Sequence, residues 1–320
     1  MVSFCTERRR RWDWQILRVL LSGLLVFAGF AGSAAAQTVN DGYEAFEAGD
    51  YERAVEIWRP LAEGGDVDAQ FYLGDLYEYG DGVEQNYGTA LEWYKLAAKQ
   101  GDAEALFRIG VFYDFGYGLD VDYETAAEFY TLSADAGHAP AQFNLGLMYL
   151  EGDGVQQDFD QALHYFERAA GQGHAGAQNS IGVMYDNGEG VAQDYAEAMR
   201  WYRLAADQGL PIAMRNIGLL YDNGRGVETD FVEAARWYRR SAELGHAPAM
   251  QDLGLMYYYG EGVPLDYELS YYWLWLAREN GDGTDEYIDG DIALTTEELT
   301  ASQIANIEAK ARAWQPRGIE

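Results

Sequence analysis

Apolar residues along most of this chain recur at spacings of three and four, the period of an amphipathic α-helix. Two such stripes fall within each stretch of about 36 residues. In residues 175–209 the first consists of Ala177, Ile181, Met184 and Tyr185, and the second of Ala198, Trp201, Tyr202 and Ala205. The pattern predicts an all-α chain built of helix–turn–helix units.

One glycine recurs every 36 residues without an insertion, at Gly74, Gly110, Gly146, Gly182, Gly218 and Gly254. A tyrosine follows each of them three residues later, a pair of glycines six and eight residues later, an aromatic residue nineteen residues later and a further glycine 27 residues later. Such a fixed period is typical of a solenoid. We predict six repeats, at residues 67–102, 103–138, 139–174, 175–210, 211–246 and 247–282.

The recurring glycine falls inside the first helix, where glycine costs about 1 kcal/mol relative to alanine. We infer that the second helix packs directly against the backbone at this point. Gly188 and Gly190 then permit the positive φ angles of a turn, and Asp194 can cap the second helix. Glu197, three residues further on, would complete a capping box.

A helix pair of this size cannot bury its own apolar face, so successive pairs must stack into an elongated, curved solenoid. Residues 37–66 are predicted to cap its N-terminal end with a single helix that contains Trp58. Residues 283–320 are predicted to form an acidic linker and a C-terminal capping helix that begins at Thr296. The apolar stripe of that last helix consists of Leu299, Ile304, Ile307, Ala311 and Trp314.

The repeat resembles the Sel1-like repeat (SLR) family, a relative of the tetratricopeptide repeat (TPR) with a longer, glycine-bearing turn. In the fourth repeat the resemblance rests on Ala177, Gln178, Ile181, Gly182, Met184, Tyr185, Gly188, Gly190, Val191, Asp194, Ala198, Trp201, Tyr202, Ala205, Ala206 and Gly209. It implies an adaptor or scaffold that binds regulators, envelope components or host factors. One branch of the family is linked to β-lactam binding and hydrolysis, but that branch is rich in cysteine pairs, which this chain lacks.

The N-terminus has the layout of a secretory signal peptide. Four arginines occupy residues 8–11, an uncharged run extends over residues 19–31, and small residues end at Ala36. We expect cleavage after Ala36, which would give a periplasmic or secreted protein that is not attached to a membrane. The alternative is an uncleaved anchor in the inner membrane, although the apolar run is short for a spanning helix.

The formal net charge of −31 argues against nucleic acid as a partner, because affinity for phosphates comes largely from Lys and Arg. The charge favours a basic partner, or serves solubility alone. Cys5, the only cysteine, would leave with the signal peptide, so packing without disulfides must stabilise an exported and, we expect, monomeric protein.

Three histidines fall at one repeat position, just after the last glycine of a repeat: His138, His174 and His246. They therefore lie about a repeat apart, which favours a role at helix ends over a zinc site. Residues 285–296 partly match a calcium-binding loop, but Tyr287 and Thr296 stand where ligands are required, which favours a solvated linker. We expect no metal and no cofactor.

No residue pattern indicates catalysis. No serine is followed by a lysine three residues later, so the Ser-x-x-Lys signature of serine β-lactamases is missing. We therefore expect a binding protein that is not an enzyme. The competing hypothesis is a protein that binds or hydrolyses cell-wall material or β-lactams.

By analogy with tetratricopeptide repeats, the first helices are expected to line a concave groove that holds a protein or peptide. One ladder of candidate contact residues changes from aromatic to polar along the chain: Phe71, Phe107, Phe143, Asn179, Arg215 and Gln251. Its neighbour consists of Tyr72, Arg108, Asn144, Ser180, Asn216 and Asp252. An extended peptide site with an apolar and a polar end fits this change, but the aromatic residues fit a buried core equally well.

Overall fold

The structure, a computed structural model, describes residues 37–281, 283 and 287–317. The predicted signal peptide, residues 1–36, lies outside the described residues. Within them all regular structure is helical, and no strand is present. The helices are α1 (Val39–Glu47), α2 (Tyr51–Glu63), α3 (Val67–Tyr79), α4 (Tyr87–Ala98), α5 (Ala103–Phe115), α6 (Tyr123–Asp135), α7 (Ala139–Glu151), α8 (Phe159–Gly171), α9 (Ala175–Asn187), α10 (Tyr195–Asp207), α11 (Pro211–Asn223), α12 (Phe231–Glu243), α13 (Ala247–Tyr259), α14 (Tyr267–Asn280), α15 (Ile288–Thr296) and α16 (Ala301–Ala311).

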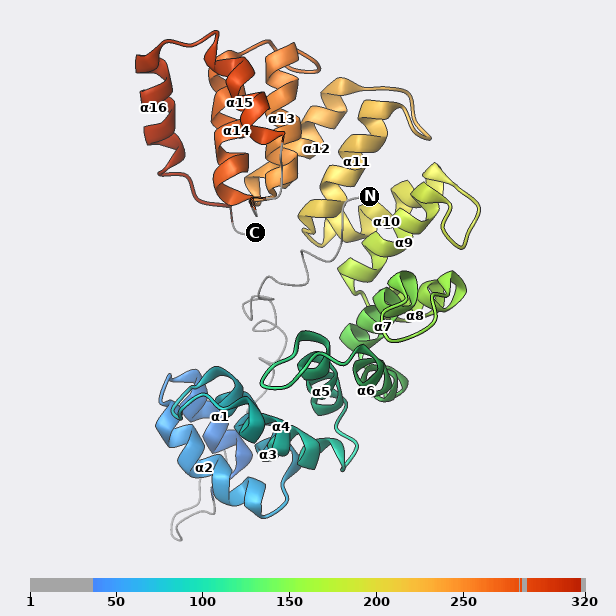
Figure 1. The fold of residues 1–320 in the computed structure, drawn as a ribbon, viewed down its shortest axis with the longest axis vertical. Helices are drawn as coiled ribbons and strands as arrows, with labels where there is room; N and C mark the ends of the chain where they lie inside the picture. Colours follow the sequence, from blue (N-terminus) through green and yellow to red (C-terminus); the bar gives the residue numbers. More distant parts are fainter. Residues whose placement is uncertain (1–36, 282, 284–286, 318–320) are drawn as a thin grey trace, which may run out of the picture. The chain divides into compact units, whose positions relative to one another are not determined.

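Each predicted repeat is a pair of helices, from α3–α4 to α13–α14, and each pair packs on the next (Figure 1). The second helix of one repeat contacts the first helix of the following repeat, so the hydrophobic core continues from pair to pair. This arrangement confirms the predicted all-α solenoid of helix–turn–helix repeats. It also means that neighbouring pairs complete the burial of each apolar face, which one pair alone leaves partly exposed.

The close approach of the two helices of a repeat depends on the recurring glycine. A Cβ atom placed on Gly182 would lie 2.6 Å from two carbon atoms of the Tyr202 ring, which packs against the backbone of α9. In the other repeats the residue at the same place also lies 2.6–2.7 Å from such a Cβ atom: Gly74 faces Tyr94, Gly110 faces Tyr130, Gly146 faces Phe166, Gly218 faces Tyr238 and Gly254 faces Leu274. The contact inferred from the sequence is therefore present in all six repeats.

The same ring carries a hydrogen bond that ties the two helices together. The Tyr202 hydroxyl donates to Asp186 at 3.2 Å, and Tyr238 donates to Asp222 at 3.2 Å. Tyr94 and Tyr130 make the equivalent bonds to Glu78 and Asp114. In repeats three and six both partners are replaced together, by Phe166 with Leu150 and by Leu274 with Tyr258. Because a buried carboxylate without a donor is costly, the acid occurs only where the tyrosine does.

The turns and helix ends follow the predicted chemistry in most respects. Gly188 ends α9 in the left-handed conformation with a φ of 76°. Asp194 caps α10 by accepting from the backbone N–H groups of Ala196 and Glu197. The expected capping box is only half formed, because the Glu197 carboxylate pairs with Arg200 at 2.6 Å instead of returning to the cap.

The N-terminal cap differs from the single helix expected there, since residues 37–66 hold two helices, α1 and α2. Thr38 and Asp41 form a full capping box that starts α1, and Gly49, with a φ of 77°, separates the two helices. The indole N–H of Trp58 donates to the Val39 carbonyl at 2.9 Å. The extra helix thus covers the large ring that α2 would otherwise leave exposed.

The C-terminal cap also has one helix more than expected. Residues 288–296 form α15, so the segment predicted to be a solvated acidic linker is helical from Ile288 onward. Thr296 is the last residue of α15, and Thr300, which forms a capping box with Gln303, starts α16. Ile307 and Ala311 of α16 are buried, and both helices pack against α14.

The glycine contact predicts a specific response to one methyl group. We expect Gly182→Ala to lower the free energy of unfolding by about 1–3 kcal/mol, because the added carbon overlaps the buried Tyr202 ring. Gly171→Ala is the matched control, since a Cβ atom at this helical glycine meets no atom within 4 Å. Alanine there should be neutral or stabilising by up to about 1 kcal/mol. Urea unfolding curves of the two variants measure the difference, and equal effects would contradict the packing described.

Candidate functional site

The three phenylalanines of the predicted ladder are half-buried and belong to the core as much as to the surface. Their ring centroids lie 5.7–5.9 Å from those of the rings that face the recurring glycines: Phe71 with Tyr94, Phe107 with Tyr130 and Phe143 with Phe166. Phe107 and Phe143 also contact His138 and His174 of the following turn. Each ring therefore supports the helix pair and presents only part of its surface.

Tyr72, in the neighbouring ladder, packs against the N-terminal cap. Its ring stacks on Trp58 with the centroids 4.8 Å apart, and Tyr43 of α1 lies 6.1 Å away. Burial raises the pKa of the Tyr72 hydroxyl, and the carboxylate of Asp68 adds to this effect. The hydroxyl is accordingly neutral at physiological pH and can act as a hydrogen-bond donor.

The polar members of the ladders pair with one another between consecutive first helices. Arg215 of α11 donates from Nε to Asp252 of α13 at 2.6 Å. Asn216 donates to Asn179 of α9 at 3.0 Å. Gln251 instead pairs with a residue outside the ladders and donates to Asp291 of α15 at 2.8 Å. The structure thus brings four predicted residues together in two pairs 37 residues apart, so their side chains are already partly hydrogen-bonded without a partner. The side chain of Asn144, on α7, is half-buried.

Arg108 is the most deeply buried arginine of the predicted site, with 13% of its side chain exposed. Its guanidinium lies 3.6 Å from Glu78 and 4.0 Å from Asp75, and the Tyr94 hydroxyl bonds to both carboxyl groups. Burial raises the pKa of Asp75 to about 7, although the Arg108 charge and the Tyr94 hydrogen bond oppose the rise. The Arg108 guanidinium therefore already interacts with buried acidic groups and is not available to bind a ligand carboxylate.

A surface that the sequence ladders do not include lies at the C-terminal ends of α3 and α5 and the start of α4. We call it the aromatic patch: Tyr79, Tyr87, Phe115 and Tyr117. Tyr117 stacks between Tyr87 and Phe115, with centroids 5.5 and 5.8 Å away. Tyr79 is 43% exposed and Tyr117 36% exposed.

Arg108 connects this aromatic patch to the predicted site. Its guanidinium donates to the Tyr79 hydroxyl at 3.2 Å and lies 5.9 Å from the centre of that ring. The signal for the patch is present in the sequence, because acidic or amide residues replace Tyr79 and Phe115 in the next three repeats: Glu151, Asn187 and Asn223. Exposed aromatic rings held in place by their neighbours are typical of protein interaction surfaces.

The histidines stand directly before first helices, as the repeat register suggested. The Nδ1 atoms of His138 and His174 accept from the backbone N–H groups of Ala141 and Ala177. The His246 Nδ1 atom instead lies 3.2 Å from the Ser241 hydroxyl. Earlier repeats use Asp66 and Asp102 as caps at this position. In the part of the chain that the structure describes, no group of three or more His, Cys, Asp or Glu side chains is placed to hold a metal ion.

Burial lowers the pKa of His174 to about 4, and the charge of His138 contributes to the shift. The folded chain therefore binds this proton less readily than the unfolded chain, whose histidine titrates near 6.5. The stability that the neutral cap provides is complete above pH 6.5 and is lost as the pH falls toward 4.

A cap that does not titrate should remove this dependence. Between pH 7 and pH 5 we expect the free energy of unfolding of the unaltered protein to fall by roughly 2 kcal/mol more than that of His174→Asn, in which the amide oxygen can still accept from Ala177. Urea denaturation at a series of pH values measures both curves. Parallel curves would show that the imidazole does not act as a neutral cap.

The geometry defines a helical repeat protein. The packing of the paired helices is the same in every repeat, and the residues on their surfaces differ from repeat to repeat. The sequence model of the Sel1 repeat matches six times, at residues 67–102, 103–138, 139–174, 175–210, 211–246 and 247–282. These matches cover more than half of the chain, which belongs to the Sel1 repeat family. Proteins of this family generally act as scaffolds for protein–protein interaction.

Solved structures of other Sel1 repeat proteins agree with this assignment. A Sel1 repeat protein from Oxalobacter formigenes is 33% identical, with a TM-score of 0.72 over 76% of this chain and 97% of that one. A protective antigen of uropathogenic Escherichia coli strains that displays an SLR fold is 27% identical, with a TM-score of 0.54 over 86% of this chain and 75% of that one. A comparison with curated protein sequences gives no match.

Proposed function

We propose that the chain is an exported interaction scaffold that holds a protein or peptide against its first helices. The observation that carries the proposal is the aromatic patch, where two partly exposed tyrosines, Tyr79 and Tyr117, are fixed by stacking and by Arg108. Fixed aromatic side chains lose little conformational entropy when a partner binds, so they give affinity at low cost. The predicted residues Phe71 and Tyr72 lie on α3, and Phe107 lies on α5.

The charge of the protein supports a basic partner. The net charge is −31, and Glu78 lies 3.6 Å from Arg108, which donates to Tyr79 of the patch. Tyrosine faces attract Lys and Arg side chains by cation–π interaction, worth about 0.5–2 kcal/mol each. A segment that combines basic and apolar side chains fits this surface best, and the negative field would speed its association.

The proposal locates the binding surface on one set of helices, and photo-crosslinking tests this. Benzoylphenylalanine at Tyr79 should give a discrete adduct in an envelope extract, whereas the same label at Leu204 should not. Leu204 is a matched control because it is 46% exposed, close to the 43% of Tyr79, but lies on α10, the second helix of repeat four, at a position equivalent to no residue of the aromatic patch. Adducts from Leu204 alone, or equal adducts from both sites, would refute the proposed surface.

We further propose that the protein is exported and released from the membrane by cleavage after Ala36. The four arginines and the uncharged run that follows support this proposal. In residues 37–281, 283 and 287–317, no helix has the length and apolar character needed to cross a membrane.

Mass determination on the protein from the periplasmic or culture fraction tests the export step. The expected mature chain begins at Gln37 and has lost the only cysteine of the sequence, so it should not react with thiol reagents. A full-length mass in the membrane fraction would instead favour an anchored scaffold.

A further inference from the structure

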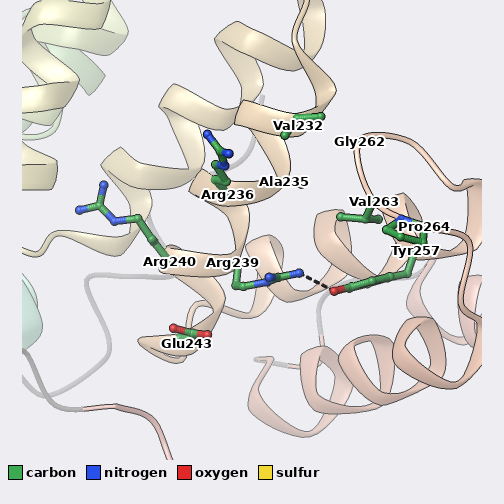
Figure 2. A pocket seen from close by; sticks show the side chains of 10 residues that line it. All are labelled: Val232, Ala235, Arg236, Arg239, Arg240, Glu243, Tyr257, Gly262, Val263 and Pro264. Carbon is green, nitrogen blue, oxygen red and sulfur yellow. Dashed lines mark hydrogen bonds between the residues drawn. The ribbon is translucent and has the colours of Figure 1, made fainter.

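A groove on the opposite set of helices has a different chemistry from the aromatic patch. It encloses about 530 Å³ between α12 and the turn that joins α13 to α14. One wall is a single stripe of α12, with Val232, Ala235, Arg236, Arg239, Arg240 and Glu243 at helical spacing. The other consists of Tyr257 and the turn residues Gly262, Val263 and Pro264 (Figure 2).

Arginine is concentrated at this groove in an otherwise acidic protein. Among the second helices of the six repeats and the N-terminal cap, α12 alone carries more basic than acidic residues, with three arginines against two glutamates. No other repeat has arginine at both positions equivalent to Arg239 and Arg240. The fourth repeat, which is the most similar, has Arg203 followed by an exposed Leu204.

Two of these arginines have no acidic partner within residues 37–281, 283 and 287–317. Arg239 donates to the Tyr257 hydroxyl, and the Arg240 guanidinium lies 4.3 Å from the centre of the Trp237 ring. Neither makes an ion pair with any carboxylate of the described residues, whereas Arg236 pairs with Glu233 at 3.1 Å. Glu243, the only acid among the described residues that line the groove, is already paired with Arg317 at 2.9 Å.

The groove also presents apolar surface beside these charges. Val232 is 49% exposed, and Val263 and Pro264 extend the apolar surface on the facing turn. Figure 2 shows Arg239 reaching toward Tyr257 while Arg240 extends along the other side of α12. Positive groups at separate points along α12, beside this apolar surface, suit an extended ligand with more than one carboxylate better than a single small anion.

We propose that this groove is a second binding site, which takes an acidic peptide segment of a partner with apolar side chains between its carboxylates. Charge complementarity favours an acidic peptide as the ligand, because arginine forms its strongest hydrogen bonds with carboxylates. The net charge of −31 repels acidic peptides from the rest of the protein surface, so we expect them to bind at the groove beside α12 and not elsewhere. The scaffold would then hold a basic segment on its first helices and an acidic segment on its second helices.

A short fluorescent peptide of alternating glutamate and leucine is the probe, and fluorescence anisotropy at low salt is the measurement. We expect Arg239→Gln with Arg240→Gln to weaken binding at least about tenfold, since two charge-assisted contacts are lost. Arg200→Gln with Arg203→Gln is the matched control, because it removes two arginines of α10 and a comparable hydrogen bond from Arg203 to Tyr221. That control should bind within about twofold of the unaltered protein, since both variants change the net charge equally.

Two further measurements separate the proposal from its alternatives. Arg239→Lys with Arg240→Lys keeps both charges and should retain most of the affinity, and a glutamine–leucine peptide should not bind. Equal weakening by the two glutamine double variants, equal binding of the amide peptide, or no binding to the unaltered protein would overturn the proposal. A dimer, seen by sedimentation, that the Arg239/Arg240 glutamine variant abolishes while the acidic peptide fails to bind would assign the groove to a second copy of the chain.

Discussion

The contact between a glycine backbone and a buried side chain of the second helix determines how closely the two helices of every repeat approach. Gly182 and Tyr202 illustrate it, and each of the other five repeats preserves the arrangement with its own pair. Any larger residue would hold the helices apart by the width of a methyl group, and the error would affect both neighbouring repeats because they share one continuous core. The helical cost of glycine, about 1 kcal/mol in each repeat, is offset by this packing.

Because the packing of the two helices is the same in every repeat, the residues at surface positions are free to differ from repeat to repeat. Repeats one and two end their first helices with Tyr79 and Phe115, repeats three to five have Glu151, Asn187 and Asn223 there, and repeat six again has a tyrosine. Repeat five places three arginines on its second helix, where repeat two has none. A single architecture can therefore present an aromatic surface and a cationic groove on different sets of helices, as a scaffold with two kinds of partner requires.

The sequence predicted the repeat and its glycine contact well because both depend on local chemistry that recurs with a fixed period. The shorter elements were missed although their signals are readable: Thr38 with Asp41 starts α1, and Ile288, Ile292 and Thr295 form a buried stripe in α15. The predicted binding ladders were harder to interpret, because partners such as Arg215 and Asp252 lie 37 residues apart. Such side chains can face a binding partner or each other, depending on how adjacent first helices align. The sequence pattern of one repeat does not determine that alignment.

The central claim is that the second-helix ring is the reason why glycine is required, and a double-mutant cycle tests it most directly. The free energy of unfolding is measured for the unaltered protein, Gly182→Ala, Tyr202→Ala and the combination. Once the ring has been removed, the account predicts that alanine at position 182 no longer destabilises and instead stabilises the helix by up to about 1 kcal/mol. The same loss of stability from Gly182→Ala in both backgrounds would show that the glycine serves another purpose.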